Sequence, residues 1–219
     1  HWLRKIEAAE LVALDTETDS LDAMRARIVG ISFATEPGVA AYVPLAHGYP
    51  GAPEQLPLQQ VLQRLQPWLE DAARPKLGQN LKYDAHVLAN HGIALAGMRY
   101  DTMLESYVWN SVATRHDMDS AAQRYLGVET IHYEDVAGKG AKQITFNQVA
   151  VERAAEYAAE DADIAGRQQQ VAIGADVGGA DGVLGAAHAP DEGRRFLLGE
   201  GLGDLLHLLT GNAGDAFDF

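Results

Sequence analysis

The first 45 residues alternate short apolar runs with polar turns. Residues 11–14 form an apolar run of the kind found in a buried strand, and residues 27–35 form a longer, β-branched one. A third run at 39–43 follows the turn residues 36–38, where Pro and Gly favour a reversal of the chain. Three strands joined by such short connections predict an antiparallel meander.

Beyond residue 57, the apolar spacing changes to that of helices. Residues 58–69 place Val61, Leu62, Leu65 and Leu69 on one side of a predicted helix, and 76–78 is a short strand candidate. Capping residues and glycines bound the remaining expected helices, at 84–90, after Asp101, after Asp117 or Asp119 up to Gly127, and from Asn147 to 165. Strands first and helix–strand alternation later imply an α/β domain with a mixed sheet.

Composition narrows the class of protein. The chain has 219 residues, 47% hydrophobic and 22% charged, which is sufficient for a packed core. No apolar stretch is long enough to span a membrane, so we expect no membrane partner. The absence of cysteine excludes disulfides and thiol nucleophiles and suits a cytoplasmic location. A net charge of −14 argues against a large basic platform for nucleic acid.

Glycine usage divides the chain. Residues 1–165 contain 10 glycines and residues 166–219 contain 12, so we expect a boundary near 166–170. The predicted domain covers 1–167, and 168–219 is a Gly/Ala-rich tail. Because the chain starts at His1, we interpret it as a fragment of a longer protein.

A pair of carboxylates follows the first apolar run. Alternate side chains of a strand face the same way, so Asp15 and Glu17 project together and Thr16 projects opposite. Two adjacent carboxylates repel each other and need a proton or a cation, for which Mg²⁺ or Mn²⁺ is suited. The alternative is an ordinary solvated strand end.

Two further acidic positions have equally ordinary alternatives. Asp84 falls where a strand gives way to a helix, so it is either an N-cap or a metal ligand. Tyr157 and Asp161 lie four residues apart on one face of the last predicted helix, where a phenol beside a carboxylate can hold a water. Spacing alone does not distinguish Asp161 from Glu160 or Asp163. Residues 138–140 are interpreted as a flexible loop.

Three ordered segments, at 14–22, 78–84 and 157–163, resemble the three exonuclease motifs of bacterial DNA polymerase I. The intervening phrases also resemble that family, including those at 36–42, 101–107, 115–120 and 137–140. The resemblance runs from about residue 11 to 164, and three motifs in order are far more specific than any one of them.

This resemblance implies a ribonuclease H-like three-layer α/β fold, with a mixed five-stranded sheet flanked by helices. It also implies a 3′–5′ proofreading exonuclease that binds the 3′ end of single-stranded DNA. By motif, the ligands of two divalent cations, Mg²⁺ or Mn²⁺ with Zn²⁺ as an option at one site, are Asp15, Glu17, Asp84 and Asp161. Tyr157 would orient the attacking water, together with Glu17. The implied nucleotide contacts are Thr16, Leu21, Gln79, Asn80, Tyr83, Arg115, Met118 and Tyr133, the last standing where relatives often have Phe.

The resemblance stops after about Asp163, where no polymerase motif can follow in the remaining residues. We therefore expect a monomeric exonuclease fragment without polymerase activity, with a tail that is out of frame or truncated. Two alternatives stay open: a ribonuclease D-like exoribonuclease with the same carboxylates, and an inactive nucleic-acid-binding fragment.

Overall fold

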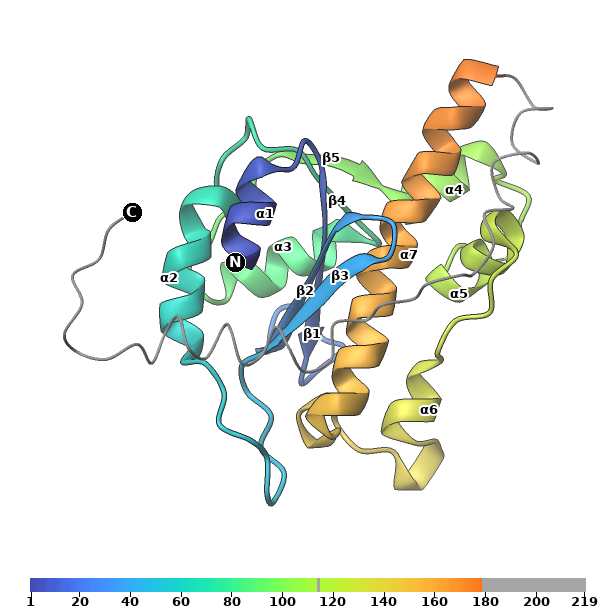
Figure 1. Ribbon diagram of the computed structural model, residues 1–219. Coiled ribbons are helices and arrows are strands. Elements are labelled where there is room, and N and C mark those ends of the chain that lie inside the picture. The colour runs from blue at the N-terminus through green and yellow to red at the C-terminus, as the bar shows by residue number, and fades with distance from the viewer. Residues whose placement is uncertain (114, 179–219) are drawn as a thin grey trace.

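The computed structural model describes residues 1–113 and 115–178, whose strands form one mixed sheet (Figure 1). The strands are β1 (Val12–Thr18), β2 (Ile28–Glu36), β3 (Val39–Pro44), β4 (Lys76–Gly78) and β5 (Met98–Asp101). They lie in the order β3-β2-β1-β4-β5. β1 and β2 pair antiparallel, as do β2 and β3, whereas β4 is parallel to both β1 and β5. This confirms the expected five-stranded fold.

Helices cover both faces of the sheet. The helices are α1 (Trp2–Ala8), α2 (Leu58–Leu69), α3 (Leu81–Ala89), α4 (Thr102–Trp109), α5 (Met118–Ala121), α6 (Tyr133–Ala137) and α7 (Val151–Gly178). A π-helical turn, η1 (Ala122–Leu126), follows α5, and two 3₁₀ turns, η2 (Gly140–Lys142) and η3 (Phe146–Gln148), precede α7. In Figure 1, α1, α2 and α3 lie on one side of the strands and α7 crosses the other.

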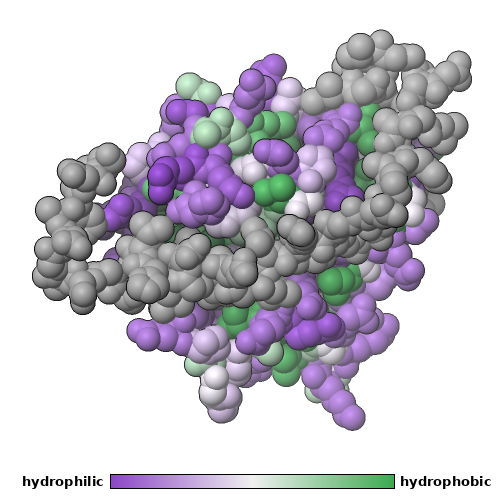
Figure 2. Space-filling model, viewed as in Figure 1, coloured by the Kyte–Doolittle hydropathy of each residue, from purple (hydrophilic) through white to green (hydrophobic). Residues whose placement is uncertain are grey.

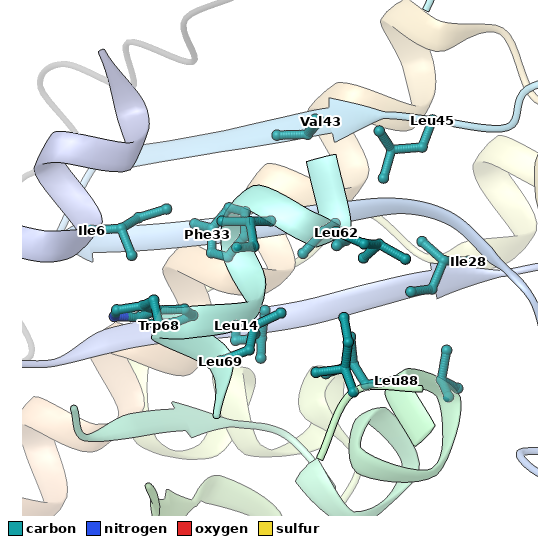
Figure 3. Close-up of a cluster of buried hydrophobic side chains, with 14 of the residues drawn as sticks. Ile6, Leu14, Ile28, Phe33, Val43, Leu45, Leu62, Trp68, Leu69 and Leu88 are labelled. Atoms are coloured by element: carbon teal, nitrogen blue, oxygen red, sulfur yellow. The ribbon is translucent and has the colours of Figure 1, made fainter. Parts of the chain in front are cut away.

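The larger hydrophobic core lies between the sheet and α1, α2 and α3 (Figure 3). Leu14 and Phe33 from the strands meet Leu69 and Trp68 of α2 there, and the rings of Phe33 and Trp68 pack edge to face. The opposite face is filled by alanines of the sheet and of α7, including Ala13 and Ala162. Small side chains on both surfaces let α7 approach β1 closely, which brings the residues of the two elements into contact.

The structure corrects several expected boundaries. α3 begins at Leu81, so Asp84 lies inside the helix and is not its N-cap; Asn80 holds that position with φ of +61°. α7 begins at Val151 and not after Asn147. Asp101 and Asp117 do cap α4 and α5, through backbone N–H groups of Met103, Leu104 and Ser120.

α7 also continues past the expected end at residue 165 and past the expected domain boundary at 167/168. Gln168 and Gln169 are buried, and the Gln168 amide donates to the carbonyl of Met118 (3.4 Å). The helix therefore continues, with tertiary contacts, through the positions where the composition changes, and the domain boundary itself stays a prediction. The rest of the predicted tail, residues 179–219, lies outside the described residues.

Figure 2 shows one face of the molecule, where hydrophilic residues surround scattered hydrophobic ones. Within the described residues, no helix combines the length and apolarity that crossing a membrane requires.

Candidate functional site

Strand β1 carries the first two acidic side chains of the site. Its residues alternate between the two faces: Leu14 enters the core beside α2, whereas Ala13 packs toward α7. Asp15 and Glu17 follow Ala13 at intervals of two and therefore also face α7. Asp15 is half-buried and Glu17 is buried.

α7 supplies the third carboxylate. Oxygen atoms of Asp15, Glu17 and Asp161 all lie within 4.8 Å of one another. Asp161 is buried against the same side of the sheet as Asp15, which the sequence interpretation required. We refer to Asp15, Glu17 and Asp161 as the carboxylate cluster.

The two other acids of this part of α7 are held elsewhere. Glu160 accepts a hydrogen bond from the backbone N–H of Ile131 (2.6 Å). Asp163 accepts one from the backbone N–H of Gly38 (2.6 Å) and forms an ion pair with Arg167 (2.8 Å). The structure thus separates Asp161 from its neighbours, which the four-residue spacing could not do.

Asp84 approaches the site from α3 but is outside the close carboxylate cluster. Its Oδ1 accepts hydrogen bonds from the Thr16 backbone N–H (3.0 Å) and hydroxyl (2.6 Å). Thr16, which the sequence suggested as a nucleotide contact, therefore positions Asp84 with its side chain. The alternation of side chains along β1 could have indicated this role of Thr16 from the sequence, because it turns Thr16 toward the face that α3 covers.

Burial and mutual repulsion disfavour the ionised form of the four carboxyl groups, those of Asp15, Glu17, Asp84 and Asp161. Burial raises the pKa of Asp15 from 3.8 to about 6. Burial and the charge of Asp15 also raise the pKa values of Glu17, Asp84 and Asp161 well above their usual range. Glu17 Oε1 is buried without a hydrogen-bond partner. A buried acceptor among crowded oxygen ligands is the environment that a hard divalent cation satisfies.

Tyr157 lies beside this cluster, one helical turn before Asp161. Burial and the charges of Asp161 and Glu17 raise the pKa of the phenol. Tyr157 therefore stays protonated at neutral pH and offers a hydroxyl, not a phenolate, to the site.

Two of the expected nucleotide contacts lie near the end of β1. Leu21 is 98% exposed in the turn after the strand. The Tyr83 hydroxyl donates to the Ser20 carbonyl (2.5 Å) and also contacts the Thr18 hydroxyl (2.6 Å). Tyr83 thus braces the turn that presents Leu21.

Gln79 and Asn80 lie between β4 and α3. The Gln79 amide donates to the His116 carbonyl (2.9 Å) and its oxygen accepts from the Thr102 hydroxyl (2.5 Å). The Asn80 backbone N–H donates to Asp101, whereas its side-chain oxygen is buried without a partner. Gln79 is therefore committed to internal contacts, and Asn80 retains an acceptor.

The three remaining expected nucleotide contacts, Arg115, Met118 and Tyr133, lie between the end of α4 and the first residue of α6. Arg115 is exposed and pairs with Asp117 (2.9 Å), and both line a groove that also includes Tyr133. Met118 is half-buried at the start of α5. Tyr133 is partly exposed, and its ring meets that of Tyr157 edge to face at 6.1 Å. This places one expected base-stacking ring directly against the expected water-orienting residue.

Comparisons with known proteins identify the family of this chain. A family model described as a 3′–5′ exonuclease matches residues 1–167. DNA polymerase I of Pseudomonas aeruginosa is 61% identical over 171 residues, covering 77% of this chain and 19% of that protein. DNA polymerase I of Rhizobium leguminosarum is 43% identical over 180 residues, covering 74% and 18%. The chain thus spans less than a fifth of the length of these relatives.

Solved structures share the fold at low sequence identity. Trypanosoma brucei RNase D superposes with a TM-score of 0.61 at 17% identity, covering 85% of this chain and 64% of that one. Brucella melitensis NrnC with bound Mg²⁺ gives a TM-score of 0.53 at 18% identity, covering 96% and 91%.

Proposed function

This chain belongs to the 3′–5′ exonuclease family, and we propose that it hydrolyses the terminal phosphodiester bond at the 3′ end of single-stranded or frayed DNA. Water adds to phosphorus and the bond from phosphorus to the 3′-oxygen breaks. The products are a nucleoside 5′-monophosphate and a strand with a new 3′-hydroxyl. The observation that carries this proposal is the meeting of Asp15, Glu17 and Asp161, with Tyr157 beside them.

The residues present fit a pair of divalent cations, Mg²⁺ or Mn²⁺. Asp15, Glu17 and Asp161 would hold them, with Asp84 completing the set through the oxygen that Thr16 does not occupy. Four carboxylates carry about −4, which two such ions would neutralise. When bound, the ions would supply an activated water and stabilise charge on the leaving 3′-oxygen.

The protein's own groups then orient the reactants. The protonated Tyr157 hydroxyl and the unpartnered Glu17 Oε1 would fix the position of the attacking water between them. Tyr133 would stack on a terminal base, and the exposed Leu21 would pack beside the end of the strand. Arg115 would contact a phosphate from its exposed position beside the groove.

The negative net charge of the chain limits its affinity for DNA. With a net charge of −14, it lacks a broad basic surface, so binding would depend on the ions and a few contacts. We expect weak, strongly salt-dependent affinity for single-stranded DNA. The cytoplasmic location and monomeric state expected from the sequence stay predictions.

The decisive experiment is digestion of end-labelled DNA and RNA strands of the same sequence, with EDTA, Mg²⁺ or Mn²⁺. Stepwise shortening of DNA from its 3′ end, only with metal, is the expected result. Preferential shortening of RNA would favour the ribonuclease D-like alternative, and binding without shortening would favour an inactive module. No binding and no cleavage of either strand would overturn the proposal.

Two substitutions on one helix provide a matched comparison. Asp161→Asn should abolish cleavage, since Asp161 belongs to the carboxylate cluster. Asp163→Asn should keep it, because Asp163 contacts Gly38 and Arg167 instead. Equal activity of the two variants would contradict the assigned site.

A further inference from the structure

Phe146 is a fully buried ring with two tyrosines of the proposed site as neighbours. Its exposed fraction is 1%. The Tyr133 ring stacks near it at 6.2 Å with an interplanar angle of 21°, and the Tyr157 ring lies at 5.9 Å and 52°. Phe146 therefore contacts both the expected base-stacking residue and the expected water-orienting residue.

The chain before Phe146 has no buried side chain between residues 139 and 145, although the Ile144 backbone N–H donates to the Ala137 carbonyl (2.8 Å). Residues 139–145 are all exposed, and Phe146 is the first buried residue after them. The exposed run 139–145, which begins within the expected flexible loop at 138–140, is therefore followed by a ring that is buried in the protein. The position of the ring depends on what holds the residues that follow.

Three hydrogen bonds hold those residues to the chain after β3. The Gly48 backbone N–H donates to the Asn147 carbonyl (2.8 Å), and His47 Nδ1 bonds the Val149 carbonyl (2.9 Å). The Val151 N–H donates to the Tyr49 hydroxyl (3.1 Å). We call this pairing of 47–49 with 147–151 the clasp.

Tyr42 connects the clasp to the sheet. Its hydroxyl bonds His47 Nε2 (2.7 Å), and its ring packs edge to face on Phe146 at 6.5 Å. The ring covers Gly30, where an added Cβ would lie 2.1 Å from the Tyr42 oxygen. Gly30 is the β2 partner of Glu17, so the aromatic cluster rests on the strand position next to the carboxylate cluster.

We propose that Phe146 is a positioning residue of the exonuclease site, which fixes the Tyr157 and Tyr133 rings beside the carboxylate cluster. The inference rests on the proposed function and deepens it. Tyr157 and Tyr133 share Phe146 as a neighbour, so removal of the aromatic ring frees both at once. Displacement of a catalytic group by about 1 Å can lower a rate a hundredfold, so a small rearrangement here is measurable.

The test replaces the ring by a flexible side chain of similar size. Phe146→Met conserves volume and so preserves the fold, and Phe33→Met is the matched control. Phe33 is also 1% exposed but packs on Trp68, across the sheet from the site. With labelled single-stranded DNA, kcat should fall at least about tenfold in Phe146→Met and stay at the wild-type value in Phe33→Met.

A double-mutant cycle separates positioning from general packing. Because part of the effect of Phe146 on hydrolysis runs through Tyr157, Phe146→Met should lower kcat less in a Tyr157→Phe background, where only its effect through Tyr133 remains. The same fold-loss in both backgrounds, or wild-type kcat in the folded single variant, would overturn the proposal.

A spectroscopic measurement distinguishes this proposal from the proposed function. In protein with isotope-labelled tyrosine, Phe146→Met should shift the ring resonances of Tyr157 and Tyr133, identified by their Phe variants, whereas Phe33→Met should not. Unshifted resonances would overturn the positioning role even if no strand is cleaved. Shifted resonances without any cleavage by the wild type would instead overturn the exonuclease function alone.

Discussion

Asp15→Asn should stabilise the metal-free protein while abolishing cleavage. Burial raises the pKa of Asp15 from 3.8 to about 6, so at neutral pH folding moves an already ionised carboxylate to a place where the charged form is unfavourable. At neutral pH this rise corresponds to about 3 kcal/mol. Asn keeps the shape without the charge, and its altered hydrogen bonding reduces the gain. We therefore expect an increase of about 1–3 kcal/mol in the free energy of unfolding.

The pH dependence has a definite sign. A carboxyl group with a raised pKa binds its proton more tightly in the folded state, so its contribution to stability falls as pH rises from about 4 to about 6. Above that window the penalty is complete. Urea denaturation in EDTA should show a difference between Asp15→Asn and wild type that grows across the window and then levels off.

Asp117→Asn is a control of opposite sign. Although burial opposes them, hydrogen bonds from Ser120 and the charge of Arg115 hold the pKa of Asp117 below its usual value. Its substitution should therefore destabilise the protein at neutral pH. Added Mg²⁺ should stabilise wild type and have much less effect on Asp15→Asn. If Asp15→Asn is no more stable than wild type at pH 7 in EDTA, the reasoning about charge crowding is wrong.

Three further changes test other parts of the structure. Thr16→Val removes the hydroxyl that donates to Asp84 at 2.6 Å. The substitution should lower the free energy of unfolding, measured in urea, by about 1–3 kcal/mol and should slow cleavage. Unchanged stability and unchanged cleavage would refute this role of Thr16. Burial raises the pKa of Glu105 from 4.5 to about 7. The melting temperature of wild type should therefore fall relative to that of Glu105→Gln as pH rises from 4.5 to 7. A difference in melting temperature that does not change with pH would contradict this prediction. A chain ending at residue 167 should melt at a lower temperature than one ending at 178, since it loses two buried glutamines, Gln168 and Gln169; equal melting temperatures would favour the boundary expected from composition.

The sequence predicted the elements whose pattern is local. The meander follows from three apolar runs with short turns, and β1 to β3 form it. The helices capped by Asp101 and Asp117 follow from side chains that satisfy free N–H groups. That the carboxylates of β1 meet α7 came from the family resemblance, because no local pattern specifies contacts across 146 residues, from Asp15 to Asp161.

The sequence did not predict elements that depend on contacts with distant parts of the chain. α1 contains seven residues without a side-chain cap, and its Trp2 and Ile6 are buried only by the rest of the fold. β5 is a four-residue edge strand with no apolar alternation, specified by its pairing with β4. α3 begins after Asn80, whose own backbone is left-handed. Asparagine tolerates this conformation, but an asparagine in a sequence does not by itself predict it.

The acids of α7 show how the fold selects one group among near-equivalents. Successive helical residues point in directions about 100° apart, so Glu160, Asp161 and Asp163 meet three different environments. Glu160 accepts a hydrogen bond from the Ile131 N–H, and Asp163 accepts one from the Gly38 N–H. Asp161 instead faces Asp15 and Glu17, whose charges oppose its ionisation. Among these three acids, only Asp161 lies where a bound cation would offset the charge of several carboxylates at once. The strand residues Asp15 and Glu17 create that difference, which the sequence of the helix alone does not specify.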